Sequence, residues 1–134
     1  MRSLQFSEVG VGDELPAIDV PVTRTSIVAG ALASRDYQDV HHDPELARRR
    51  GSKDIFMNIL TTNGYVGRFV TDWAGPDAIL KKVAIRLGAP NYPGDTMRMT
   101  GTVTSAAEGQ VEVAIKGANS LGDHVTATVT VTLP

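Results

Sequence analysis

One apolar stripe constrains the fold of this chain more than any other feature. Between Ile55 and Trp73, hydrophobic residues recur at steps of three and four, which is the spacing of one face of an α-helix. The stripe consists of Phe56, Ile59, Leu60, Val66, Phe69, Val70 and Trp73. Gly75 and Pro76 follow and predict that the helix ends there. About 18 residues at about 1.5 Å each predict a rod of roughly 27 Å.

The residues after this helix alternate between hydrophobic and polar side chains, a pattern typical of β-strands. The alternating segments are residues 80–87, 96–104, 111–115 and 125–131. Short turns are expected between them, the last at Leu121–His124, which places His124 on the surface at a hairpin tip. A long helix followed by consecutive strands predicts one α+β domain over residues 1–134, with an antiparallel meander wrapped around the helix.

The residues before the central helix predict smaller elements. Residues 18–23 alternate like a strand, and Pro21 implies an edge position. A short helix is expected over residues 25–35, capped by Ser26 or Thr25. A second is expected over residues 45–50, with Asp43 as its N-cap and Pro44 in its first turn.

Composition excludes several classes of protein. The chain has no cysteine, which excludes disulfide frameworks, thiolate nucleophiles and cysteine-based metal sites. The net charge of −2 gives no indication of nucleic acid or an anionic membrane as the main partner. No apolar run is long enough to span a bilayer, and the first residues do not resemble a signal peptide, so we expect a cytoplasmic protein.

A polar segment ahead of the central helix carries most of the residues that could perform chemistry. It contains Asp36, Asp39, His41, His42 and Asp43. A loop of this composition beside a helix N-terminus can supply general acid–base groups, and the free N–H groups of the helix can stabilise an oxyanion. Two alternatives stay open: a solvated loop whose aspartates cap helices, and a metal site formed by Asp36, His41, His42 and Asp43.

The same segment resembles the signature of the MaoC-like, (R)-specific enoyl-CoA hydratases, in which a histidine follows an aspartate by five residues. The matching residues are Asp36, His41, Asp43 and Ala47. The opening Val9–Pro16 and the turn Tyr92–Asp95 are also similar. The resemblance implies the hot-dog fold, a curved antiparallel sheet around one long central helix. It also implies addition of water across an α,β-unsaturated acyl-CoA, with the coenzyme A thioester as substrate and with no cofactor or metal.

Three further runs are similar to one branch of this family, the small MaoC-like subunits of bacterial steroid (cholesterol) side-chain enoyl-CoA hydratases. These runs are residues 51–56, 70–76 and 121–128. The resemblance implies a partner, a second MaoC-like subunit with an additional OB-like domain, in an α2β2 heterotetramer. Three alternatives stay open: a homodimeric hydratase or dehydratase of ordinary fatty acyl thioesters, a hot-dog thioesterase and a non-catalytic partner subunit. The thioesterase needs a carboxylate beside the central helix, where only Asp54 and Asp72 lie near its ends.

The resemblance also implies roles for individual residues. Asp36 and His41 hold one water molecule, and we expect His41 to be the base because neutral imidazole accepts a proton near pH 7. A backbone N–H of Met57 or Asn58 stabilises the developing oxyanion, although the family usually has a glycine where this chain has Asn58. Asp39 stands where the family usually has asparagine.

The remaining polar residues of this region are expected to support the loop or the substrate. The expected loop supports are Asp39, His42 and Asp43. One basic cluster follows, formed by Arg48, Arg49, Arg50 and Lys53. These cations could bind the phosphates of coenzyme A, and a solvated helix face is the alternative.

Overall fold

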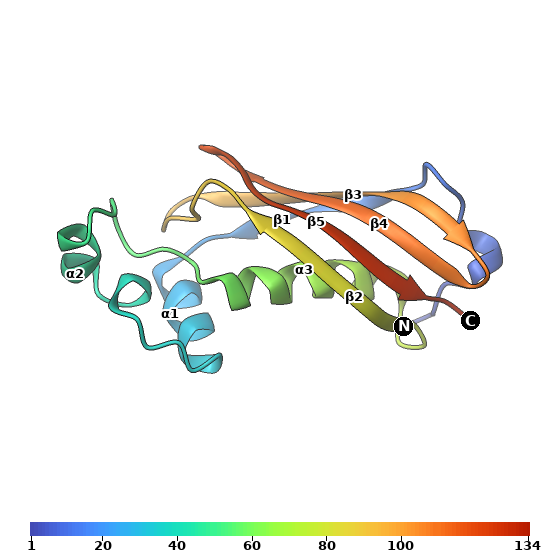
Figure 1. Ribbon diagram of the computed structural model, residues 1–134, viewed down its shortest axis with the longest axis horizontal. Coiled ribbons are helices and arrows are strands. Elements are labelled where there is room, and N and C mark those ends of the chain that lie inside the picture. Colours follow the sequence, from blue (N-terminus) through green and yellow to red (C-terminus); the bar gives the residue numbers. More distant parts are fainter.

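The computed structural model describes all residues, 1–134, and consists of a five-stranded antiparallel sheet with one long helix along its inner face (Figure 1). The strands are β1 (Glu14–Pro21), β2 (Ile79–Leu87), β3 (Thr96–Ala107), β4 (Gln110–Asn119) and β5 (Gly122–Thr132). The helices are α1 (Arg24–Ala33), α2 (Pro44–Arg49) and α3 (Ile59–Ala74), with the 3-10 turns η1 (Phe6–Glu8) and η2 (Asp39–His41). This is the α+β, hot-dog architecture that the sequence predicts.

The strand order differs from a simple meander. The order is β1-β3-β4-β5-β2, so only β3, β4 and β5 are neighbours in chain order. β2 pairs with β5 instead of β3, and the segment after it crosses the end of the sheet before β3 begins. β1 and β2 form the two edges, which agrees with the edge position that Pro21 implies.

The central helix begins four residues later than the stripe predicts. Residues 55–58 are extended because their backbone is held by other segments. Phe56 N–H donates to the carbonyl of Val40 at 3.1 Å, and Met57 N–H donates to the carbonyl of Asn91 at 3.1 Å. Asn58 then acts as N-cap, and the helix ends at Gly75, whose φ of 91° suits glycine.

The core lies between α3 and the inner face of the sheet. From α3, Val66, Phe69 and Val70 are buried. They face buried residues of β3, β4 and β5, among them Met97, Met99, Val113 and Val129. Two other residues of the stripe, Ile59 and Leu60, are about half exposed, at 51% and 52%. The stripe therefore combines a core face with a surface that no part of this chain covers.

His124 is buried and does not lie at a hairpin tip. The turn between β4 and β5 is formed at Ser120–Leu121, so His124 already belongs to β5. Its Nδ1–H donates to the carbonyl of Ala89 at 2.7 Å, and its Nε2 accepts from the Thr62 hydroxyl at 2.8 Å. The prediction of a surface position was wrong because the turn falls two residues earlier than expected.

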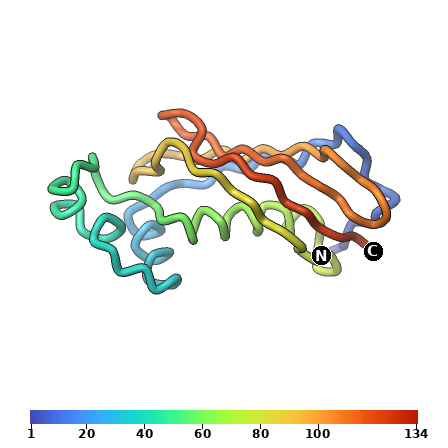
Figure 2. Tube along the Cα trace, viewed as in Figure 1, coloured from blue at the N-terminus to red at the C-terminus, as the bar shows by residue number.

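The two ends of the molecule differ in character. Figure 2 shows both termini at one end of the sheet, where Phe6 N–H donates to the carbonyl of Pro134 at 2.8 Å. The segment from α1 to α2 lies at the opposite end, beside the start of α3. The polar segment thus meets the N-terminus of α3, as the sequence predicts. No helix has the length and hydrophobicity that crossing a membrane requires.

Candidate active site

The end of α1 determines where Asp36 points. Arg35 adopts a left-handed conformation with φ of 56°, which is uncommon for a residue with a side chain. Its N–H donates to the carbonyl of Leu32 at 3.1 Å, and Asp36 N–H donates to the carbonyl of Ala31 at 2.9 Å. This pair of bonds is a Schellman motif. It ends the helix and turns the chain so that Asp36 faces the start of α3.

His41 lies at the end of η2 and is almost fully buried. Its Nδ1 is 2.7 Å from the carbonyl oxygen of Phe56, and its ring contacts the Phe56 ring edge-on at 4.9 Å between centroids. A carbonyl only accepts, so Nδ1 carries the hydrogen and Nε2 keeps its lone pair. In this tautomer, Nε2 of His41 can accept a proton near the N-terminal end of α3.

The free nitrogen of His41 faces Asp36. Nε2 lies 3.4 Å from Asp36 Oδ2. This distance is longer than an ordinary N–H···O hydrogen bond, and both atoms are acceptors in the neutral-histidine state. The pair can therefore bind one water molecule between them. The structure brings together the two residues predicted as catalytic.

Asp36 is held as an anion. Asn58 Nδ2 donates to Oδ2 at 3.1 Å, and the Gln38 N–H donates to Oδ1 at 3.3 Å. The hydrogen bond from Asn58 is the main cause that lowers the pKa of Asp36, with smaller contributions from Gln38 and His41. Hydrogen bonds to the charged form favour ionisation. Asp36 is therefore suited to orient water as a carboxylate.

The first turn of α3 offers backbone donors beside this pair. The N–H groups of Asn58, Ile59 and Leu60 have no acceptor within the chain. The N–H of Met57, by contrast, already donates to the Asn91 carbonyl. The prediction of Met57 as an oxyanion donor was therefore wrong, because its hydrogen is used to anchor the extended segment. The φ of −78° at Asn58 is open to any residue, so this position does not require glycine. The Asn58 N–H stays available because it has no acceptor in the chain.

The residues predicted to support the loop do so in different ways. Asp39 accepts two hydrogen bonds from Arg50, at 2.7 and 2.8 Å, which lower the pKa of the Asp39 carboxyl. Asp43 caps α2 through the N–H of Leu46. His42 is exposed and contacts the Tyr37 carbonyl through Nε2 at 3.1 Å. These contacts turn His42 and Asp43 away from His41, and the chain contains no cluster of three or more potential metal ligands.

The basic cluster does not act as one unit. Arg50 is paired with Asp39, and Arg49 with Glu45 at 2.7 Å. Arg48 and Lys53 are exposed and have no ion pair. Only these two cations are free to meet a phosphate.

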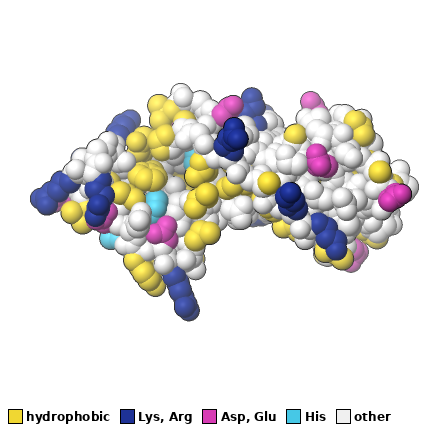
Figure 3. Space-filling view, viewed as in Figure 1, with side chains coloured by type: hydrophobic (Ala, Val, Ile, Leu, Met, Phe, Trp, Pro, Cys, Tyr) yellow, Lys and Arg dark blue, Asp and Glu magenta, His cyan; other side chains and the backbone are white.

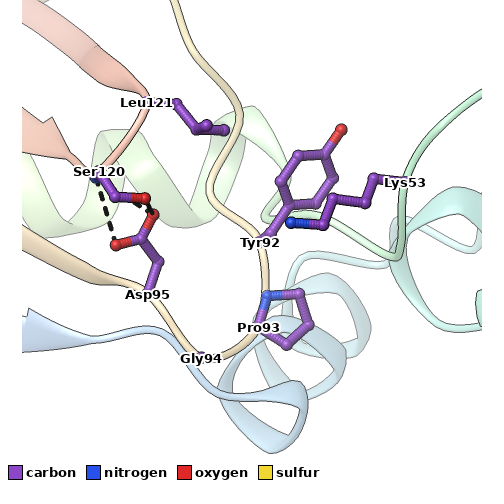
Figure 4. A pocket seen from close by; sticks show the side chains of 7 residues that line it. All are labelled: Lys53, Tyr92, Pro93, Gly94, Asp95, Ser120 and Leu121. Carbon is purple, nitrogen blue, oxygen red and sulfur yellow. Dashed lines mark hydrogen bonds between the residues drawn. The ribbon is translucent and has the colours of Figure 1, made fainter.

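Lys53 borders a hollow of about 330 Å³ between the segment before α3 and the β2–β3 connection (Figure 4). Its Nζ lies 5.8 Å from the centre of the Tyr92 ring, which forms one wall. Asp95 forms another wall, and its hydrogen bonds with Ser120 lower the pKa of its carboxyl. The hollow therefore contains one cation, one carboxylate and an aromatic face.

Sequence reasoning missed the side chains that hold Asp36. Asn58 is buried and also donates to Ser34 Oγ at 2.9 Å. Its position before the helical run is a standard N-cap signal, and that signal could have placed its side chain. The contact with Asp36 could not be found in this way, because it joins residues that are 22 positions apart.

Comparisons with known proteins identify the family of this chain. The family description "MaoC like domain" matches residues 8–130. The chain is 54% identical over 119 residues to the "3-oxo-4,17-pregnadiene-20-carboxyl-CoA hydratase beta subunit" of Mycobacterium tuberculosis, covering 89% of this chain and 92% of that protein.

Solved structures show the same fold. A chain of the ChsH1-ChsH2 complex from Mycobacterium tuberculosis superposes with a TM-score of 0.92 at 51% identity, covering 93% of this chain and 98% of that one. An (R)-hydratase from A. caviae involved in PHA biosynthesis superposes with a TM-score of 0.82 at 20% identity, covering 94% and 98%. The second likeness concerns the fold alone. This chain belongs to the MaoC-like domain family.

Proposed function

We propose that this chain is the catalytic subunit of an enoyl-CoA hydratase that adds water to the α,β-unsaturated acyl-CoA of a steroid side chain. The observation that carries the proposal is the 3.4 Å separation of Asp36 Oδ2 and His41 Nε2. The identity of 54% with a protein named for a steroid-derived CoA ester supports the substrate class. The coenzyme A thioester is the substrate, the reaction needs no further cofactor, and a cytoplasmic location suits such a substrate.

In this reaction, Asp36 and His41 share one water molecule. The Asp36 carboxylate accepts one of its hydrogens and orients it, while His41 Nε2 removes the other proton as the oxygen attacks C3 of the acyl group. The imidazolium then returns that proton to C2, which completes the addition of one water. Positioned acid–base groups of this kind contribute about 10²–10⁴-fold in rate, or roughly 3–5 kcal/mol.

Negative charge develops on the thioester oxygen as water adds. The free N–H groups of Asn58, Ile59 and Leu60 lie at the positive end of α3 and are suited to bind this oxygen. Removal of one such donor typically costs about 10²–10³-fold in other enzymes, so the helix terminus is a major part of the proposed mechanism.

We further propose that the site is completed by a partner subunit, a second MaoC-like chain with an OB-like domain, in an α2β2 assembly. β2 is an edge strand with three exposed hydrophobic side chains, Ile79, Leu80 and Leu87. At the end of the molecule that carries α1 and α2, Figure 3 shows hydrophobic side chains gathered around a histidine and an acidic side chain. Exposed apolar surface of this kind marks interaction sites. The related chain was solved in a complex, which supports a hetero-oligomer.

The experiment is to purify the chain with and without the product of the neighbouring gene and to incubate each with steroid and linear enoyl-CoAs. Mass spectrometry then measures the gain of one water. Hydration of the steroid thioester by the complex supports the proposal. Hydration of crotonyl-CoA by the chain alone favours a homodimeric fatty acyl hydratase, release of free coenzyme A favours a thioesterase, and hydration that is insensitive to Asp36 and His41 substitutions favours a non-catalytic partner.

A further inference from the structure

The side chain of Asn58 joins the central helix to the proposed catalytic pair. Its Oδ1 accepts from the N–H of Thr61 at 3.0 Å and from the Thr61 hydroxyl at 2.5 Å, and so caps α3. Its Nδ2 donates to Ser34 Oγ at 2.9 Å and to Asp36 Oδ2 at 3.1 Å. Both ends of this amide are therefore occupied, one by the helix and one by the loop that carries Asp36.

The orientation of the Asn58 amide follows from its partners. The backbone N–H of Thr61 is a donor, so the atom that faces it must be the oxygen. The NH₂ group then points to Ser34 and Asp36, and both of its hydrogens have an acceptor. Ser34 is fixed in turn, because its hydroxyl donates to the carbonyl of Gly30 at 2.7 Å. Only an amide side chain can accept a hydrogen bond from a helix N–H through its oxygen and also donate two hydrogen bonds through its nitrogen.

Asn58 contacts the carboxylate oxygen of Asp36 that faces His41. Asn58 donates to Oδ2, and Oδ2 is also the oxygen that lies 3.4 Å from His41 Nε2. His41 is the titratable group that faces Asp36, since Asp39 is bound to Arg50 and Asp43 to the Leu46 N–H. Asn58 therefore provides an uncharged donor where the only other neighbour of Oδ2 is the imidazole.

We propose that Asn58 is a positioning residue, which holds Asp36 as an anion with Oδ2 directed at His41 and thereby fixes the catalytic pair to the N-terminus of α3. The effect of Asn58 on the rate rests on the proposed function. Its effect on the ionisation of Asp36 is independent of the reaction. The glycine that the family usually has at this position would leave the carboxylate without this donor. This chain thus holds its carboxylate by a contact that a glycine cannot make.

Two substitutions separate positioning from helix capping. Serine and aspartate are both good N-cap residues, so Asn58→Ser and Asn58→Asp retain an acceptor for Thr61 but lack the amide donor. Asn58→Asp also places a second carboxylate beside Asp36, and neighbouring like charges raise the pKa of one of them. Thr23→Ala is the matched control, because it removes the N-cap of α1 without contacting the pair.

The measurements are kcat and KM against pH for the subunit with its partner, the melting temperature, and the Asp36 carboxyl titration by ¹³C NMR. We expect kcat to fall at least about tenfold in Asn58→Ser, with little change in KM. The acid limb of the kcat profile and the Asp36 titration should move to higher pH, further in Asn58→Asp. Thr23→Ala should lower the melting temperature and leave the pH profile unchanged.

Two results overturn the proposal. One is an Asp36 titration that is the same in wild type and Asn58→Ser. The other is a loss of kcat in Asn58→Ser that follows the melting temperature, with an unmoved pH profile, because that result shows a structural role alone. If the wild-type complex hydrates none of the thioesters, the proposed function fails, and the Asp36 titration still decides the role of Asn58.

Discussion

The Nδ1 atom of His41 lies 2.7 Å from the carbonyl oxygen of Phe56. This contact fixes the tautomer of the imidazole, because the carbonyl can only accept a hydrogen bond. Phe56 is itself held in place, since its N–H donates to the carbonyl of Val40 in the turn that carries His41. Residues 55–58 thus orient the proposed base before they enter α3.

The first prediction concerns the catalytic pair. His41→Ala and Asp36→Asn should each lower kcat by about 10²–10⁴-fold, because each removes one of the two groups that hold and deprotonate water. The far-UV circular dichroism spectrum should be unchanged, since neither side chain belongs to the hydrophobic core between α3 and the sheet. His42→Ala is the matched control and should retain most of the turnover, because the His42 ring contacts the Tyr37 carbonyl and not Asp36. A His41→Ala variant with nearly full kcat would remove His41 from the mechanism.

The sequence predicted local features of this site well. The spacing of Asp36 and His41, the N-cap at Asp43 and the end of α3 at Gly75 all depend on short-range patterns, and the structure contains each of them. The hot-dog fold followed from one helical stripe, several alternating segments and the family resemblance. These features could be predicted because they depend on residues close together in the chain.

The failures have a common physical cause. The start of α3, the burial of His124 and the occupied N–H of Met57 all depend on contacts with the β2–β3 connection. Backbone hydrogen bonds between segments that are far apart override local periodicity there. The pairing of β2 with β5 could not be predicted for the same reason, because hydrophobic alternation does not specify which strand is the neighbour.

The second prediction concerns coenzyme A. Arg48→Ala and Lys53→Ala should raise KM, with kcat nearly unchanged, if these unpaired cations bind phosphate. Added salt should raise the KM of the wild type toward that of the variants, because it screens exposed charges. Arg50→Ala is the contrasting variant and should lower kcat instead, since its guanidinium is bound to Asp39 in the catalytic loop. Equal KM values in wild type and both variants at low salt would exclude a phosphate contact.

The third prediction concerns the stability contributed by His124. Burial is the main cause that lowers its pKa from the ordinary value of 6.5. A histidine whose pKa is lowered in the folded state contributes its full stabilisation above the pKa that it has in the unfolded chain. This contribution is lost as the pH falls through the pKa of the folded state. The free energy of unfolding should therefore decrease between about pH 7.5 and 5.5, by at most about 1.4 kcal/mol per pH unit for one group.

Denaturant unfolding of wild type and His124→Gln over this pH range tests the assignment. The variant should be less stable at neutral pH and should lack this dependence. Asp36, Asp39 and Asp95 do not interfere, because their pKa values are lowered from 3.8 and their contributions are lost only in more acidic solution. Thr62→Val should cost about 1–3 kcal/mol, since it leaves Nε2 of His124 without its donor. A wild-type stability that is constant across this range would contradict the prediction.

The fourth prediction compares two helical glycines. A Cβ at Gly30 in α1 would lie 2.2 Å from Thr61 Oγ1 and 2.9 Å from Thr61 Cγ2, so Gly30→Ala must push α1 away from α3 or rotate Thr61. Thr61 is bonded to Asn58, and Ser34 is bonded to the Gly30 carbonyl, so the shift reaches the residues that hold Asp36. We expect Gly30→Ala to destabilise the fold by about 1–3 kcal/mol and to lower kcat.

Gly64 in α3 has no atom within 4 Å of such a Cβ, and it is exposed in this chain. Gly64→Ala should therefore stabilise the isolated chain by about 0.5–1 kcal/mol, because alanine loses less conformational entropy in a helix than glycine does. Thermal unfolding of the two variants beside wild type makes the comparison. The changes in stability of the two variants should have opposite signs. Both substitutions gain the same helix propensity, but only Gly30 lies where two helices touch. If Gly30→Ala were as stable as Gly64→Ala, the close approach of α1 and α3 that brings Ser34 and Asp36 to Asn58 would not exist.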